Sequence, residues 1–533
     1  MNEALKLRFR LLVLAALMIC VPPAGAQEPP RPAPHLCAAR CAGSLSGPFF
    51  LLDAAVATQK PAPSQKPNPP ADHAARISPQ QAEELFRSVD SILQWVGKET
   101  ALEIKHPVKR QLSSPAEVQS YVEERIKTDE DAKRLERSEL VVKKFGLLAR
   151  DFDLSKFLVR LLREQVVGFY DPKKQTVFLL NWVEPEEQKP VLAHELTHAL
   201  QDQNFDLEKW MRAGAPPGGG ASSKEKDPRK LQEEIDADER QAARQAVGEG
   251  QGMAVLVDYL LAPTGRNLLT APEFVTVLKQ GMTTGGDSPI FASAPIFLKE
   301  SLTFPYRYGL DFMQTLLGEG KERAFAGALK NPPVDTRQIM EPKRYLAGEQ
   351  VPAVPLPDFA AVLGKNWERF DVGGVGEFDI RLIVEQFGAE SAARRLAPAW
   401  RGGYYYAAGK RGEKLESTAG LSMIYVSRWA SEDEARDFSH MYAASIARKY
   451  QSARATTGAS ANPQRWTTEE GPVMLEIVGD LVVVTESFEP ALAAKLRDAA
   501  VAAAKPKIMA QDERRFAPPD RPKAAGPTHV SPF

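Results

Sequence analysis

The stretch VLAHELTHAL, residues 191–200, contains the strongest structural signal in this chain. Its apolar residues surround two histidines, His194 and His198, that stand four positions apart. On an α-helix such residues lie about 40° apart around the axis and one turn along it. The stretch therefore predicts a buried helix over about residues 186–203 that presents two imidazoles on one face.

The two histidines are candidate metal ligands. Neutral imidazole is a natural zinc ligand, and a catalytic zinc usually takes three protein ligands. Glu195 lies about 100° around the helix from His194, so it does not share the face of the histidines. Zinc makes water a nucleophile at neutral pH, and Glu195 can act as the general base for that water. The alternative is a pair of core histidines beside a solvated glutamate.

A third ligand must come from another part of the chain. The remaining histidines are isolated in the sequence, and Asp202 is two turns from His194, too far for its short side chain. Glu249 is the better candidate, because it falls within the apolar stripe of a helix predicted over residues 229–261. An unpaired carboxylate there would be costly, so it requires a cation or strong hydrogen bonds.

Three glycines surround Glu249 in the sequence. Gly248, Gly250 and Gly252 would let their helix approach another closely, at a propensity cost of about 1 kcal/mol each. This cost indicates that the close approach matters. The alternative is a glutamate that emerges into solvent at a glycine kink.

The composition limits the class of protein. A chain of 533 residues that is 43% hydrophobic predicts two or three domains. A formal net charge of −1 argues against a nucleic-acid binder, and three cysteines exclude a disulfide-dense scaffold. The sequence does not indicate an oligomeric state.

The start of the chain has the pattern of an export signal. A basic start containing Lys6 is followed by an apolar run over residues 11–21 and by the small residues Ala24 and Ala26. The run would rise only about 16 Å as a helix, against a hydrocarbon core of about 30 Å. We therefore expect a signal peptide over 1–26, a periplasmic or extracellular protein, and no membrane span after cleavage. An uncleaved anchor is the alternative.

The rest of the chain predicts an α+β protein. We expect a Pro-rich disordered linker over 27–77, a mostly helical domain with a small edge sheet over 78–350, and a disordered tail over 505–533. A smaller α+β domain with an antiparallel sheet is expected over 351–504. The elements expected in these parts are a strand over 102–108, a hairpin over 166–180, a helix over 379–396, strands over 404–408 and 423–429, and a hairpin over 473–486.

Three blocks of the sequence resemble a known family. These are GFYDP (168–172), VLAHELTHALQDQNFDL (191–207) and PPVDTRQIMEPKRYL (332–346). They are similar to the gluzincin branch of zinc metallopeptidases, the thermolysin-like clan, and within it to a poorly characterised group of exported bacterial proteins. The resemblance implies a zincin-like domain that holds one Zn²⁺ and hydrolyses a peptide or protein substrate. It also implies that the hairpin pairs with the substrate backbone.

The resemblance assigns roles to particular residues. It implies that His194, His198 and Glu249 bind zinc and that Glu195 is the catalytic base. The clan places an acidic residue four positions after the third ligand, where this chain has Met253, so support for one histidine must come from elsewhere.

An oxyanion stabiliser is also expected. Tyr306 and Tyr308 are the candidates, and the alternative for both is core packing. A catalytically inactive zincin-fold binding module of the cell envelope is the competing hypothesis for the whole chain.

Overall fold

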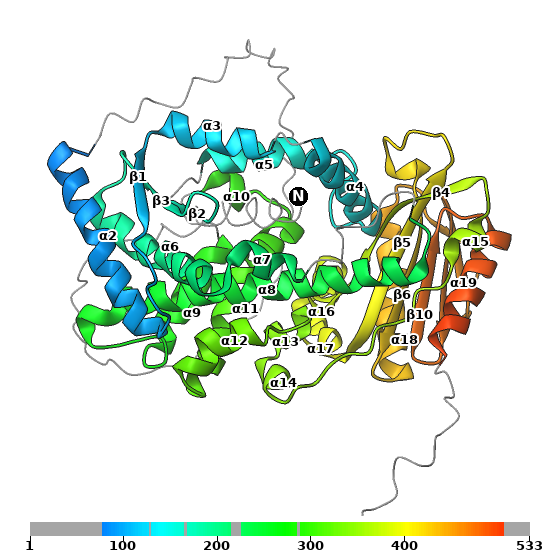
Figure 1. Cartoon of the computed structure of the whole chain (residues 1–533). Helices are drawn as coiled ribbons and strands as arrows, with labels where there is room; N and C mark the ends of the chain where they lie inside the picture. Colours follow the sequence, from blue (N-terminus) through cyan, green and yellow to red (C-terminus); the bar gives the residue numbers. More distant parts are fainter. Residues whose placement is uncertain (1–76, 127–128, 165–167, 215–224, 285–287, 506–533) are drawn as a thin grey trace, which may run out of the picture.

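The computed structural model describes residues 77–126, 129–164, 168–214, 225–284 and 288–505 (Figure 1). The predicted signal peptide, almost all of the predicted linker and tail, and the first residues of the predicted hairpin lie outside these ranges. Among the described residues, no helix combines the length and the apolar character that a membrane crossing requires. The architecture is α+β, as the sequence predicts.

The first half of the described chain is mostly helical. Its helices are α2 (Pro79–Thr100), α3 (Pro115–Ile126), α4 (Asp129–Phe145), α5 (Leu154–Glu164), α6 (Pro185–Phe205), α7 (Leu207–Arg212), α8 (Pro228–Leu261), the 3₁₀ turn η2 (Ala262–Thr264), α9 (Pro272–Thr284), α10 (Pro289–Ala292), α11 (Ile296–Gly318), the π-helical turn η3 (Arg323–Gly327), α12 (Ala328–Lys330), α13 (Thr336–Met340) and α14 (Pro342–Leu346).

Helix α6 lies at the centre of this half (Figure 1). Every residue from Val191 to Gln201 is buried, so the helix has no solvent-facing side over three turns. A helix that is buried all round must be covered by other elements on each side. Here α2, α8 and a small sheet provide that cover, and the two histidines therefore point into the protein interior.

The small sheet has three strands in the order β1-β3-β2. Strand β1 (Lys109–Ser113) runs parallel to β3 (Thr176–Leu180), and β2 (Phe169–Asp171) pairs with β3 as the predicted hairpin. Gln188 at the start of α6 bonds both the N–H and the carbonyl of Leu180. These bonds fix the start of α6 to the end of the strand that precedes it.

The second half is built on a seven-stranded antiparallel sheet. The sequence predicts an antiparallel sheet here without its number of strands. Its strand order is β4-β5-β6-β10-β9-β8-β7. The elements are α15 (Phe359–Leu363), β4 (Trp367–Gly374), α16 (Glu377–Phe387), α17 (Glu390–Leu396), η4 (Ala397–Ala399), β5 (Trp400–Lys410), η5 (Thr418–Gly420), β6 (Ser422–Trp429), α18 (Glu432–Lys449), β7 (Arg454–Ala455), β8 (Gln464–Thr468), β9 (Gly471–Val478), β10 (Leu481–Glu486) and α19 (Pro490–Ala504).

Both faces of this sheet are covered. Along β6, Met423 and Tyr425 face the core that contains α16 and α18, whereas Ile424 and Val426 face the core that contains α15 and α19. Side chains alternate between the faces of a strand, so an unbroken apolar run is what a doubly covered strand requires. Strand β10, with Leu481 at its start, follows the same pattern.

Segments from the first half complete the second half. Val141 and Phe145 of α4 belong to the core on one face of the large sheet, and Leu231 and Ile235 of α8 belong to the core on the other. Helix α8 has 34 residues and is therefore about 50 Å long, which lets it reach from α6 to β4 (Figure 1). The chain enters the second half near residue 351, but residues far upstream help to form its cores.

Two predicted elements are wrong in detail. Residues 102–108 form no strand, because the ladder with β3 begins only at Lys109, after Pro107, which has no N–H to donate. The helix predicted over 379–396 is two helices, since α16 ends at Phe387, Gly388 is its C-cap, and α17 starts at Glu390. Glycine is a poor helix former and supplies this interruption.

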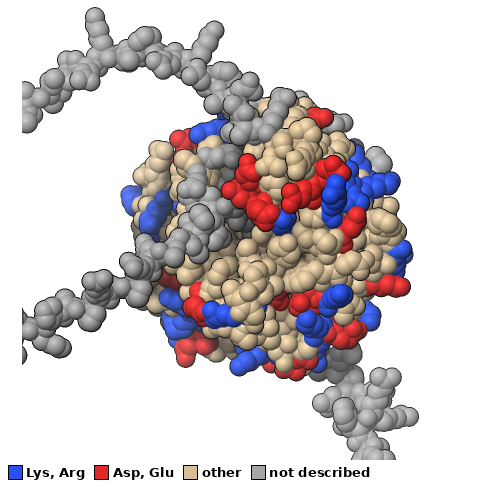
Figure 2. All heavy atoms as spheres, turned by 90° about the vertical axis from the view of Figure 1, so that its left-hand side faces the viewer, with Lys and Arg blue, Asp and Glu red and all other residues tan. Residues whose placement is uncertain are grey.

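The surface carries charges of both signs. Figure 2 shows the side of the molecule that is at the left of Figure 1, where acidic and basic side chains are interspersed among uncharged ones. This distribution agrees with the nearly balanced composition of the chain.

Candidate metal centre

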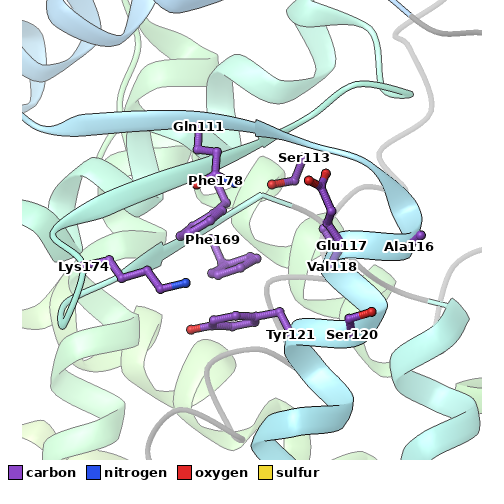
Figure 3. Close-up of a pocket in the computed structure, with 10 residues that line it drawn as sticks. All are labelled: Gln111, Ser113, Ala116, Glu117, Val118, Ser120, Tyr121, Phe169, Lys174 and Phe178. Carbon is purple, nitrogen blue, oxygen red and sulfur yellow. The ribbon is translucent and has the colours of Figure 1, made fainter.

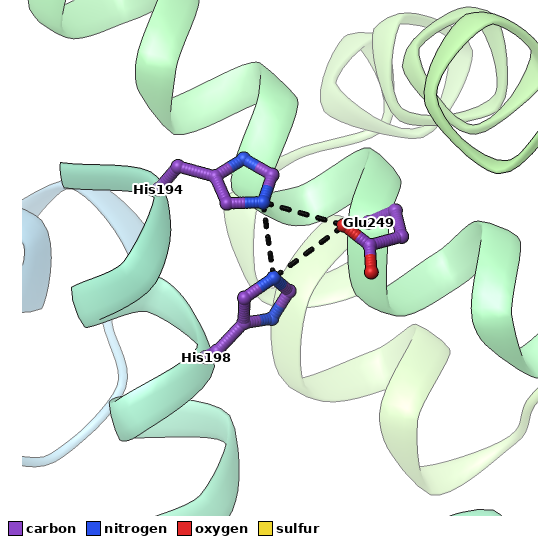
Figure 4. Close-up of side chains that lie close together, drawn as sticks. All are labelled: His194, His198 and Glu249. Atoms are coloured by element: carbon purple, nitrogen blue, oxygen red, sulfur yellow. Dashed lines mark hydrogen bonds and ion pairs between the residues drawn. The ribbon is translucent and has the colours of Figure 1, made fainter. Parts of the chain in front are cut away.

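The two histidines of α6 point their outer nitrogens at one position. The Nε2 atoms of His194 and His198 are 3.0 Å apart, and the rings are nearly perpendicular, with an interplanar angle of 83° (Figure 4). Both side chains are buried. The spacing of four residues on a buried helix therefore produces the pair of converging imidazoles that the sequence predicts.

Glu249 reaches the same position from α8. Its Oε2 atom is 3.3 Å from Nε2 of His194 and 3.5 Å from Nε2 of His198 (Figure 4). The residue is only 1% exposed, and among the described residues its carboxylate oxygens have no hydrogen-bond partner. The structure thus brings together all three residues that the sequence singles out as metal ligands.

The donor set suits a zinc ion. Tetrahedral zinc with bonds of about 2.0–2.1 Å places its ligand atoms about 3.3 Å apart, and the three separations here are 3.0, 3.3 and 3.5 Å. Two imidazoles and one carboxylate are also a ligand set that catalytic zinc sites use. A buried carboxylate that forms no well-aligned hydrogen bond is otherwise expensive, unless a neighbouring group carries a positive charge.

Electrostatic coupling within the cluster is strong. Burial alone would lower the pKa of His198, but the adjacent Glu249 carboxylate outweighs burial and raises that pKa to about 9. Burial alone would raise the pKa of Glu249, but the charges of His198 and His194 lower it to about 2. Without a cation, the carboxylate is thus stabilised by a protonated imidazole.

Glu195 lies beside the cluster without being one of its three donors. Its Oε2 atom accepts a hydrogen bond of 2.8 Å from the backbone N–H of Tyr170 in β2. Burial raises the pKa of Glu195, although His194 and His198 oppose the increase. The side chain of Glu195 therefore extends from α6 to the edge strand β2. This is the position beside the histidines at which a general base is expected.

The structure separates the two tyrosine candidates. The ring of Tyr306 on α11 is nearly parallel to that of His194, with ring centroids 6.3 Å apart. Its buried hydroxyl has no hydrogen-bond partner among the described residues. Tyr308 points to the other side of α11, where it packs on Phe304 and Phe378. Of the two candidates, Tyr306 lies beside the cluster, whereas Tyr308 packs on aromatic side chains of the core.

The excluded residues lie elsewhere. Asp202 accepts hydrogen bonds from the Tyr170 hydroxyl and from the backbone N–H of Leu207, so its carboxylate is used outside the cluster. His106 bonds to its neighbour Pro107 and not to the cluster.

One important residue was missed by sequence reasoning. The Nδ1 atom of His198 is 2.8 Å from Oε1 of Gln201, which supplies the support that the Met253 position does not. The available signal was an uncharged amide three residues after the second histidine, on the same helix.

Glycines on α8 set the distances between helices. A Cβ added at Gly250 would lie 2.4 Å from the carbonyl oxygen of Gly309 on α11, and one at Gly252 would lie 2.6 Å from Cε1 of His194. No side chain fits at either position. The predicted close approach of this helix is confirmed, and it involves both α11 and the imidazole of α6.

We expect Gly252→Ala to weaken zinc binding. The new methyl group would overlap the His194 ring and turn it away from Glu249, so affinity should fall by about 10–100-fold. Competition with a chelator of known affinity measures the change. Gly248→Ala is the matched control on the same helix, because its Cβ would meet nothing closer than 4.0 Å. Equal affinities for the two variants would contradict the steric role of Gly252.

A cavity of about 400 Å³ lies away from the metal centre (Figure 3). It is bounded by α3 and by the face of the small sheet that carries Phe169 and Phe178, whereas the neighbouring Tyr170 bonds to Asp202 of α6 on the opposite face. Tyr121 stacks on Phe169, with ring centroids 4.8 Å apart. The sheet therefore separates this cavity from the three ligands.

Comparison with known proteins finds no family model, no curated protein and no solved structure that matches this chain. The chemistry of the site is therefore the basis on which a function can be argued.

Proposed function

We propose that this chain is an exported, zinc-dependent metallopeptidase that hydrolyses peptide bonds. The observation that carries the proposal is the buried cluster of His194, His198 and Glu249 with Glu195 beside it. Three protein ligands are the usual number in a catalytic zinc site, whereas structural sites usually have four. The export signal expected at the start of the sequence supports a periplasmic or extracellular location.

In this proposal the side chains around the ligands perform the proton transfers. A zinc ion in the cluster would act as a Lewis acid that makes water a nucleophile and polarises a carbonyl group. Glu195 would take a proton from the attacking water and deliver it to the leaving amine. Its raised pKa supports this role, because a general base works best when its pKa is near the operating pH.

The edge strand β2 provides a surface for a peptide backbone. It is one of the two outer strands of the small sheet, and β3, the strand that directly precedes α6, is the central one. The backbone N–H of Tyr170 donates to Glu195, so the outer edge of β2 adjoins the proposed base. An extended peptide added there would gain main-chain hydrogen bonds with little demand on its sequence.

We expect Tyr306→Phe to slow hydrolysis without loss of zinc. Burial, together with the carboxylates of Glu249 and Glu195, raises the pKa of Tyr306 well above its ordinary value, so its hydroxyl keeps a proton to donate. Removal of one donor to a developing oxyanion lowers kcat by about 10²–10³-fold. Tyr308→Phe is the control and should leave kcat unchanged. Similar kcat values for the two variants would exclude Tyr306 from the reaction.

Metal analysis combined with a peptide-library assay tests the proposed function. The purified protein should contain one zinc per chain and should cleave unfolded protein or peptides, whereas His194→Ala should lose both properties because one of three ligands is removed. Chelation should abolish cleavage, and added zinc should restore it. A protein that binds no zinc and still cleaves peptides would contradict the proposal.

A binding module with an inactive zincin fold is the second candidate. The observation that favours it is burial: the three ligands, Glu195 and Tyr306 are almost fully buried, and the cavity described above lies on the other side of the small sheet. Fully zinc-loaded protein that cleaves no member of a peptide library would support this candidate over the enzyme.

A further inference from the structure

Two buried glutamines link His198 to a distant backbone segment. The amide nitrogen of Gln201 donates to Oε1 of Gln251 over 2.8 Å and to the carbonyl oxygen of Gly248 over 3.1 Å. The amide nitrogen of Gln251 donates to the carbonyl oxygens of Ala324 and Phe325 in η3, both over 2.9 Å. Both glutamines are completely buried, so water does not compete for these bonds.

The direction of this chain of hydrogen bonds is fixed by backbone carbonyl oxygens at both glutamines. The carbonyl oxygens of Ala324 and Phe325 can only accept, so the group of Gln251 that faces them must be its NH₂. Its oxygen then faces Gln201, which must present its own NH₂ there and its oxygen to His198. The Nδ1 atom of His198 must therefore carry a hydrogen.

This hydrogen determines which nitrogen of His198 can bind a metal. A neutral imidazole has one N–H and one lone pair, so a hydrogen on Nδ1 leaves the lone pair on Nε2. Nε2 is the atom that faces Glu249 and the other histidine. Reversal of the Gln201 amide would require Nε2 to keep the hydrogen, and it would place the Gln201 oxygen against the oxygens of Gln251 and Gly248.

The second histidine is positioned differently. Nδ1 of His194 is buried and has no hydrogen-bond partner among the described residues, and its ring packs directly on Gly252. Steric contact orients this ring, whereas hydrogen bonds orient the ring of His198. A disturbance of the two glutamines should therefore act on His198 alone.

We propose that Gln251 is a positioning residue that acts through Gln201 to keep the hydrogen of His198 on Nδ1 and the Nε2 atom ready for the metal. The effect on metal binding rests on the proposed zinc site. The hydrogen on Nδ1, in contrast, is a property of the protein with or without the ion. According to this proposal, the η3 turn supports the metal centre, although it lies more than 70 residues after Gln251 in the sequence.

Methionine variants of the glutamines test the proposal in the full chain. Gln201→Met should lower zinc affinity by about 10–100-fold, and Gln251→Met should lower it by up to about tenfold, because the Gln201 amide then keeps only the Gly248 carbonyl to hold its orientation. Gln188→Met is the matched control, since Gln188 is a buried glutamine of α6 that makes three hydrogen bonds to backbone groups around β3. It should reduce stability and leave zinc affinity unchanged.

A second readout does not depend on the metal. In protein labelled with ¹⁵N-histidine, the Nδ1–H proton of His198 should give a slowly exchanging signal in the metal-free wild type. The signal should persist in Gln188→Met and exchange more rapidly in Gln251→Met, because the Gln201 oxygen that accepts this hydrogen bond is then held less firmly. Assignment comes from its loss in His198→Asn.

The outcomes distinguish the inference from the proposed function. Wild-type zinc affinity and an unchanged Nδ1–H signal in Gln251→Met would overturn the inference, and so would equal losses of affinity in Gln251→Met and Gln188→Met. A wild type that binds zinc without cleaving peptides would reject the peptidase and leave the inference standing. If the wild type binds no zinc, the Nδ1–H signal of the metal-free protein still decides the role of Gln251.

Discussion

Glu195→Gln should reduce peptide hydrolysis by about 10²–10⁴-fold while zinc content stays at the wild-type level. The substitution preserves the shape of the side chain and removes its ability to accept a proton. The amide oxygen of Gln can still accept the hydrogen bond from the Tyr170 N–H, so β2 and α6 should keep their relative positions. The expected loss therefore concerns proton transfer, and kcat should fall more than KM rises.

The measurement compares kcat, zinc content and folding in one set of variants. His194→Ala is the informative companion, because it should lose both zinc and hydrolysis, whereas Glu195→Gln should lose hydrolysis alone. If Glu195→Gln kept more than about a tenth of the wild-type kcat, another group would have to act as the base. Loss of zinc in Glu195→Gln would instead assign Glu195 to the ligand set.

Gly309→Ala should destabilise the protein by about 3 kcal/mol or more. A Cβ at this position would lie 2.3 Å from the carbonyl oxygen of Ala246 and 2.9 Å from Cα of Gly250. Both obstacles are backbone atoms of α8, so no side chain can move aside, and α8 and α11 would have to separate. Glu249 and Tyr306 lie beside this contact on the two helices, so zinc affinity should fall as well.

Urea denaturation of the metal-free protein measures the change in unfolding free energy. Gly318→Ala, at the end of the same helix, is the control because its Cβ would meet no atom within 4 Å. It should be neutral or slightly stabilising, since alanine favours a helix by about 1 kcal/mol over glycine. Equal stabilities of the two variants would show that α8 and α11 can separate at little cost.

Burial of the site is the observation that bears on both candidate functions, the enzyme and the binding module. Catalysis requires that a peptide reach Glu195 and the three ligands, and all four side chains are buried. The outer edge of β2 is the place that we propose for the peptide backbone, because Tyr170 contacts Glu195 there. A peptide bound at this edge would replace water and strengthen the electrostatic interactions of the proposed base.

Much of the local structure could be predicted from the sequence. The helix expected over 186–203 is observed as Pro185–Phe205, and the hairpin expected over 473–486 is observed as β9 and β10. Apolar periodicity, turn residues and caps act over a few residues, so they can be recognised without knowledge of the fold. The pair of histidines belongs to the same class, since one turn of helix determines their spacing.

The mistakes occur where local patterns conflict. Helix α11 was not predicted, because Pro305 and Gly309 interrupt its pattern, yet both are buried in a helix that packs along α8. The stabilisation there comes from packing on α8, which the sequence does not reveal. The strand predicted over 102–108 fails for the opposite reason, since its apolar residues are suitable for a strand but Pro107 cannot join the ladder.

The sequence by itself determined the two imidazoles on one face of α6 and the carboxylate of Glu195 beside them, because helical geometry is local. Only the tertiary structure decided that Glu249 completes the cluster, that Tyr306 and not Tyr308 faces His194, and that Gln251 reaches His198 through Gln201. Each of these depends on how far apart α6, α8 and α11 lie and how each is rotated about its axis. Contacts such as that between Gly250 and Gly309 set those quantities, and they join residues too distant in the sequence for any local pattern to relate.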